Sequence, residues 1–133
     1  MRDPSARPRI VVPRPQRLRT LSNIPFGWLD ARLHSRHWID LLSPEALAVY
    51  TFLCLAADRQ GVSYYRRDRI GVTLGLHEDA LRRAFDRLYQ LDLVAYQPFH
   101  QHASDGFHQV LSLPEGSPPA FEELLRGPDD DDE

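Results

Sequence analysis

The stretch from His77 to Leu91 constrains the fold more than any other part of the chain. Its apolar residues recur at positions i, i+3, i+4, i+7 and i+10, and they are Leu81, Ala84, Phe85, Leu88 and Leu91. This spacing places them on one face of an α-helix. The other face then carries Arg82, Arg83, Asp86, Arg87 and Gln90. The pattern predicts a helix with one buried stripe and an arginine-bearing face that is open to solvent.

A second helix is predicted by the start signal Ser43-Pro44-Glu45. Serine is a good N-cap, and proline suits the first helical position. We expect this helix to run from Ala46 to about Arg59 and to stop at Gly61. One face carries Val49, Phe52, Leu53 and Ala56, and another carries Leu47, Tyr50, Cys54 and Ala57. A helix that is apolar on two faces is covered on two sides. The second cover is either the segment that holds Trp28 and Trp38 or a second subunit.

The remaining elements are shorter. We expect a short helix or irregular segment over Ile24–Leu42, a short strand at Val62–Tyr64, a helix over Arg66–Leu74 that ends in a tight turn at Gly75, and two strands at Leu93–Phe99 and Phe107–Leu113. His100–Gly106 lies between the two strands and ends in the turn signal Ser-Asp-Gly. The sequence therefore predicts one domain at 24–113 that is mostly α with a small β-hairpin.

Charge is strongly segregated along the chain, although the net charge is only -3. Met1–Arg19 holds six arginines and one aspartate, Thr20–Leu113 holds nine arginines and ten acids, and Pro114–Glu133 holds one arginine and eight acids. Prolines in the first stretch exclude a helix or a central strand there. We expect a basic flexible arm at 1–23 and an acidic flexible tail at 114–133.

Several classes of protein are disfavoured. The single cysteine, Cys54, excludes an intrachain disulfide, and the sequence holds no run of apolar residues that could span a membrane. We expect a cytoplasmic location and no membrane partner. No cysteine or acid stands at ligand spacing beside the pairs His34/His37 and His100/His102, so we expect no metal and no cofactor. No catalytic motif is present, so we expect that the chain is not an enzyme.

Three stretches resemble a known family. They are Leu42–Tyr50, Ile70–Leu76 and Leu81–Leu88. They are similar to the helix-turn-helix domains of plasmid and phage replication initiators and of small mobile-element regulators. That family reads "leucine, serine, proline, any, alanine" in its first helix and "leucine-glycine-valine-serine" at its turn. The resemblance implies a winged helix-turn-helix, with a three-helix core and a β-hairpin wing.

The resemblance also implies a DNA-binding site. It places Arg82, Arg83 and Arg87 on the outer face of a recognition helix in the major groove, His77 at the start of that helix, Arg66, Arg67 and Arg69 at the backbone-crossing helix, and His100, His102 and His108 at the wing. Two departures stand out. His77, Glu78 and Asp79 occupy positions where the family has serine, threonine or arginine, and Arg66 stands where it often has a capping serine.

Two functions follow. The leading hypothesis is a sequence-specific protein that binds double-stranded DNA as a homodimer, acting as a transcriptional regulator or an accessory replication factor of a plasmid or mobile element. Leu47, Tyr50, Cys54 and Ala57 form the candidate dimer interface. The acidic tail would either screen the arginines or recruit a basic protein partner. The alternative is a protein-interaction module on the same scaffold, in which the arginines only solvate a helix face and Asp79 pairs with Arg83.

Overall fold

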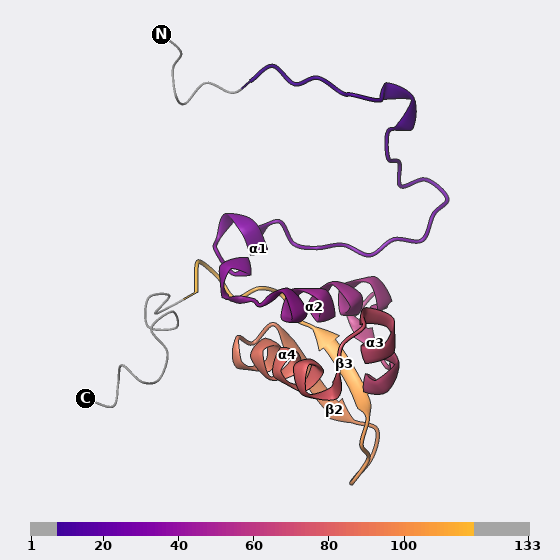
Figure 1. Ribbon diagram of the computed structural model, residues 1–133, viewed down its shortest axis with the longest axis vertical. Coiled ribbons are helices and arrows are strands. Elements are labelled where there is room, and N and C mark those ends of the chain that lie inside the picture. The colour runs from indigo at the N-terminus through magenta and orange to yellow at the C-terminus, as the bar shows by residue number, and fades with distance from the viewer. Residues whose placement is uncertain (1–7, 119–133) are drawn as a thin grey trace, which may run out of the picture.

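A computed structural model describes residues 8–118, and it contains four α-helices and a three-stranded antiparallel sheet (Figure 1). In chain order the elements are η1 (Pro15–Arg17), α1 (Arg32–Ser35), η2 (Ile39–Leu41), α2 (Pro44–Ala56), β1 (Val62–Ser63), α3 (Arg67–Leu74), α4 (Glu78–Gln90), β2 (Val94–Pro98) and β3 (Gly106–Val110). The predicted combination of helices and a C-terminal hairpin is confirmed. The expectations for 1–7 and for most of the acidic tail, from 119 onward, lie outside the described residues.

The sheet has the order β1-β3-β2. The β2–β3 hairpin runs in register from Val94 opposite Val110 to Pro98 opposite Gly106. The strand β1 adds to the other edge of β3, where Val62 lies opposite Gln109. Gly61 permits this approach, because a Cβ atom there would lie 2.7 Å from the Val110 carbonyl oxygen. A local strand after α2 is thereby tied to the last strand of the domain.

The core lies between α2, α4 and the sheet. All five residues of the predicted α4 stripe are buried: Leu81, Ala84, Phe85, Leu88 and Leu91. They pack with Val49 and Leu53 of α2 and with Leu93 and Val94 at the start of the hairpin. The helical period of these residues thus identified the main packing surface.

Helix α2 begins as predicted and ends early. The Ser43 Oγ atom accepts a hydrogen bond from the Ala46 amide at 3.1 Å, which confirms the N-cap. The helix ends at Ala56 rather than near Arg59. The reason is Asp58, whose carboxylate accepts hydrogen bonds from the amides of Gln60 (2.8 Å) and Val62 (3.0 Å). An aspartate that binds the backbone ahead of it stabilises a turn in competition with a helix.

The second face of α2 is covered by the chain itself. Tyr50 and Cys54 are only 2% and 7% exposed, so they are not available as a dimer interface, and that expectation is corrected. The segment before α2 supplies the cover: Gly27 lies against the Cys54 carbonyl, and Trp38 is buried in the same core. Trp28, in contrast, is 73% exposed and is not a core residue.

The arm is exposed throughout its described part, residues 8–23. It contains no strand, as predicted, but it has one turn of 3-10 helix at Pro15–Arg17, where none was expected. Pro15 stands at the first position of that turn, where its missing amide and fixed φ are tolerated. Figure 1 shows the arm leaving the helices at the end of the molecule opposite to the hairpin tip.

Candidate nucleic-acid interface

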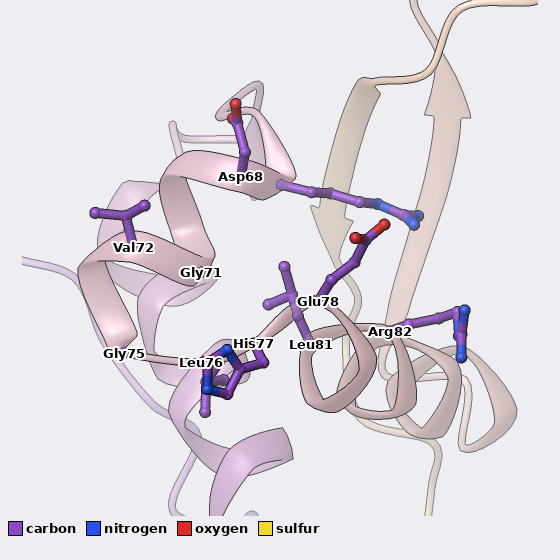
Figure 2. A pocket seen from close by; sticks show the side chains of 10 residues that line it. Asp68, Gly71, Val72, Gly75, Leu76, His77, Glu78, Leu81 and Arg82 are labelled. Carbon is purple, nitrogen blue, oxygen red and sulfur yellow. The ribbon is translucent and has the colours of Figure 1, made fainter.

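Helices α3 and α4 form a compact pair joined by a tight turn. Gly75 ends α3 in the left-handed conformation, with φ 69° and ψ 32°. The amide of Gly75 donates to the Val72 carbonyl (3.3 Å) and that of Leu76 to the Gly71 carbonyl (2.9 Å). This is the closing pattern that glycine commonly gives to a helix. The tight turn at Gly75, predicted from sequence, is confirmed, and it brings the start of α4 beside α3 (Figure 2).

A groove of about 690 Å³ lies between these two helices. Figure 2 labels the apolar side chains Val72, Leu76 and Leu81 and the polar or charged ones Asp68, His77, Glu78 and Arg82 that line it. Arg67 also lines the groove. Val72 is 82% exposed. The groove therefore combines an apolar lining with a rim of both charge signs.

The free face of α4 lies opposite its buried stripe. Arg82 and Arg83 are both exposed there, as predicted. Arg82 Nη2 lies 3.2 Å from Asp79 Oδ1, so Asp79 pairs three residues ahead rather than with Arg83. An exposed pair of this kind stabilises little. Both guanidinium groups can therefore turn toward a ligand, but the acids Glu78, Asp79 and Asp86 share the same face.

Arg87 does not belong to this free face. Its Nε donates to the Leu41 carbonyl at 2.9 Å, and its Nη1 donates to Gln90 Oε1 at 3.0 Å. The Leu41 carbonyl lies at the end of η2, where the backbone leaves an acceptor that needs a donor. Arg87 thus joins α4 to the segment before α2. These contacts give Arg87 a structural role, and the predicted reading of bases would require that it leave them.

Arg67 is half-buried and is likewise held by other residues. Its guanidinium carbon lies 4.9 Å from the centre of the Phe85 ring and 5.1 Å from that of Tyr96. Its Nη2 donates to the Tyr89 hydroxyl at 2.9 Å. These contacts join the start of α3 to α4 and to the hairpin. A guanidinium held between two rings and a hydroxyl stabilises the core, and the predicted phosphate contact would require that it leave these partners.

His108 was expected at the surface of the hairpin, but it is 2% exposed. Its ring stacks on Phe85 with the centres 4.6 Å apart, and its Nε2 lies 2.9 Å from the Tyr89 hydroxyl. The Tyr89 hydroxyl thus accepts from Arg67 and also shares a hydrogen bond with Nε2, whose direction is set by the imidazole tautomer. Burial, with the nearby Arg67 charge, lowers the pKa of His108 to about 4. His108 belongs to the core and cannot reach a phosphate.

The other predicted site residues are exposed, but they are not gathered at one place. Arg66 precedes α3 and pairs with Asp68, while Arg69 is exposed on α3. His77 precedes α4, and its side chain makes no capping hydrogen bond. His100 and His102 lie on the loop of the hairpin. The structure thus brings His77 and Arg82 to the groove and leaves the histidines of the loop at a separate end.

The exposed apolar residues at the hairpin loop and at the groove were not predicted from the sequence. Phe99 and Phe107 flank the hairpin loop, and their rings meet edge to face with centres 4.9 Å apart. Val72 lies on the groove, as noted above. In the hairpin Phe107 lies opposite Gln97, so Phe99 is its diagonal neighbour, and Val72 stands off the Ile70/Leu74 stripe of α3. Both signals were present in the pattern of apolar residues.

The described residues contain no clustered metal ligands, no reactive thiol and no membrane-spanning helix. Within residues 8–118, no cluster of three or more histidine, cysteine, aspartate or glutamate side chains is arranged to hold a metal ion. Burial raises the pKa of the Cys54 thiol to about 11, so this group stays protonated and unreactive at neutral pH. None of the described helices is long and apolar enough to cross a membrane.

Comparison of the chain with protein-family models, with curated proteins and with solved structures found no match. A functional assignment therefore depends on the residues and geometry of this chain alone. The exposed arginines on α4, next to the α3–α4 groove, are the features on which it can be based.

Proposed function

We propose that the chain is a sequence-specific double-stranded DNA-binding protein with a winged-helix fold, in which α4 enters the major groove and the β2–β3 hairpin is the wing. The order of elements supports this proposal. Three helices, α2, α3 and α4, are followed directly by a hairpin, as in the family that the sequence resembles. In such proteins the second helix of the pair contacts base edges while the first crosses the backbone.

The observation that carries the proposal is the exposure of Arg82 and Arg83 on α4, opposite its buried stripe. The arginine fork matches the two acceptors of guanine in the major groove, and carboxylates accept from the amino group of cytosine. Asp79, which is already paired with Arg82, would then read a cytosine or orient the arginine. A helix face of mixed charge suits selection between sequences better than general attraction to phosphate.

The biological role follows the resemblance: a transcriptional regulator or an accessory replication factor of a plasmid or mobile element. A homodimer is proposed because most helix-turn-helix proteins bind two half-sites through protein symmetry. Its interface must use a surface other than the second face of α2, since Tyr50 and Cys54 are buried within one chain.

The α3–α4 groove favours a second candidate function, that of a protein-interaction module. Val72 is exposed beside Leu76 and Leu81, so an apolar side chain of a partner would bury these residues. The nearly balanced charge of the surrounding face suits a protein surface as well as it suits DNA.

Selection from a random duplex pool, followed by anisotropy titration of the enriched sequence, separates the two candidates. We expect a sequence to be enriched, and we expect Arg82→Gln with Arg83→Gln to weaken its binding by about tenfold to a hundredfold per lost guanine contact. Arg59→Gln is the matched control, because Arg59 is exposed on the turn after α2. If no sequence is enriched in about 50–100 mM salt, where even non-specific binding persists, the interaction module is favoured.

A further inference from the structure

The arginines between Arg9 and Arg19 lie in a stretch of sequence without acids. Arg9, Arg14, Arg17 and Arg19 are exposed, and none forms an ion pair with another residue in the range 8–118. The sequence holds no acid between Asp3 and Asp30. Their positive charge is therefore not compensated locally.

The arginines of the folded domain, in contrast, lie among acids and ring contacts. Arg32, Arg66 and Arg82 pair with aspartates two or three positions away. Arg67 and Arg87 are held by the core contacts described above. Over Thr20–Leu113 the acids outnumber the arginines by ten to nine. Arg36, Arg59, Arg69 and Arg83 are exposed and form no ion pair within 8–118, but the domain as a whole carries no net positive charge that would attract phosphates.

We propose that residues 8–23 of the arm bind the phosphates of duplex DNA and supply most of the electrostatic affinity, while α4 selects the sequence. The inference rests on the proposed function only in taking the same duplex as the ligand. Phosphate contacts give affinity and base contacts give specificity, so the two tasks can belong to different segments.

The prolines of the arm suit it to this task. Pro8, Pro13 and Pro15 disfavour regular secondary structure and promote an extended backbone. In a polyproline II conformation the five steps from Arg9 to Arg14 span about 15 Å, which covers several phosphates of one strand at roughly 3.4 Å each along the axis. Arg9 stands fifteen positions before Ile24, a reach of about 50 Å when extended. The arm can therefore follow the backbone beyond the footprint of the domain.

An anionic membrane surface is the other polyanion that such a segment could meet. Arginine and the apolar run Ile10-Val11-Val12 would both contribute to binding there. Surface-bound segments of this kind are usually amphipathic helices, and the prolines prevent a helix of useful length. The arm therefore fits a duplex better than a bilayer.

The test uses the full chain and a fluorescein-labelled, mixed-sequence duplex of about three helical turns. Anisotropy gives the association constant between about 50 and 200 mM salt. Changing Arg9, Arg14, Arg17 and Arg19 to glutamine should reduce the slope of log K against log salt by about 3.6, or 0.9 for each phosphate contact. The ratio of native to variant affinity should then shrink on the order of a hundredfold across this range.

A charge-matched pair of variants supplies the control. Arg14→Gln with Arg17→Gln should reduce the slope by about 1.8, whereas Arg36→Gln with Arg59→Gln, which removes the same charge from the domain surface, should leave it nearly unchanged. All four positions are exposed, so equal unfolding temperatures should accompany these changes. Equal slopes for the two pairs would overturn the inference.

The inference and the proposed function fail separately. If the arm variant loses its salt slope but the native chain enriches no sequence, the arm binds DNA and the role of α4 is wrong. If a sequence is enriched and the arm variant keeps the native slope, α4 binds DNA and the inference about the arm is wrong. Tighter binding of the native chain to phosphatidylserine vesicles than to the duplex would also overturn the inference.

Discussion

Helices α2 and α4 have the same central place in the fold but opposite surface patterns. Helix α2 is apolar almost all round, and the chain covers it on both sides, with α4 on one and the 26–41 segment on the other. Helix α4 has one buried stripe and one exposed face. Helix α2 therefore serves mainly to pack the domain together, whereas α4 has an exposed face that is available to bind a partner.

The three arginines of α4 differ in the same way. Arg87 lies at the border of the buried stripe and is bound by the Leu41 carbonyl, whereas Arg82 and Arg83 lie within the exposed face. On this helix the arginine next to the buried stripe is bound within the protein, whereas the two arginines farther from the stripe remain available to a ligand. The sequence pattern alone counts all three arginines as equivalent.

The largest loss of stability is expected from a substitution in the buried stripe of α4. Phe85 is fully buried, stacks on His108 and lies under the Arg67 guanidinium. Phe85→Ala should lower the free energy of unfolding by about 3–5 kcal/mol, through the lost burial and the cavity left behind. Urea unfolding measures this, with Asp86→Ala on the exposed face as a control expected to stay within about 0.5 kcal/mol. A loss below about 1 kcal/mol for Phe85→Ala would contradict the proposed packing.

The next largest effect is a pH dependence of stability. It arises on the side of α4, because the one buried histidine among the described residues packs against that helix. The pKa of His108 is about 4 in the folded protein and 6.5 ordinarily, so between these values the unfolded chain binds the extra proton. Stability should therefore fall as pH decreases from 6.5 to 4, by up to about 3 kcal/mol. Urea unfolding at several pH values measures this slope.

His108→Leu is the control for that pH series. The groups around His108 are Phe85, Tyr89 and Tyr96, with Arg67 and Asp105 as nearby charges. The variant loses the Tyr89 contact at every pH, so its absolute stability drops, but the decrease between pH 6.5 and 4 should flatten. An unchanged pH slope in the variant would assign the titration to other groups.

The third effect tests whether the second face of α2 is covered by its own chain. A Cβ atom on Gly27 would lie 2.6 Å from the Cys54 carbonyl oxygen and 2.8 Å from Leu55 Cα, which are backbone atoms that cannot turn away. Gly27→Ala should therefore lower the unfolding free energy by about 1–3 kcal/mol. Trp28→Ala, next in the chain but exposed, should change it by less than about 0.5 kcal/mol. The reverse order would show that the segment does not lie on α2.

Much of the fold followed from local signals. The α4 stripe, the Ser43 cap, the Gly75 turn and the hairpin each depend on spacing or on the chemistry of one residue, and all were predicted. The end of α2 was not, because Asp58 binds the amides of Gln60 and Val62 in competition with the helix. The partner that covers Tyr50 was left open, since periodicity shows that a face is buried but not by what.

The candidate site was predicted less well. Arg67, Arg87 and His108 look like surface groups in the sequence, but Tyr89, Leu41 and Phe85 bind them from distant positions in the chain. A buried polar network of this kind depends on tertiary contacts, and no local pattern encodes it. Arg82 and Arg83 were placed correctly because helical geometry alone determines their exposure.

The smallest expected effect concerns how the two helices begin. Ser43 caps α2 through its side chain, whereas His77 stands at the same position of α4, with the same extended backbone, and makes no such bond. Ser43→Ala should therefore destabilise the protein by about 1 kcal/mol, and His77→Ser should stabilise it by up to about 1 kcal/mol, because serine can accept a hydrogen bond from the Ala80 amide. Thermal unfolding of both variants measures these opposite shifts. If His77→Ser gives no gain, the start of α4 is already satisfied in another way. If it gains stability but loses affinity for the selected duplex, the imidazole at the mouth of the groove serves binding at the expense of the helix.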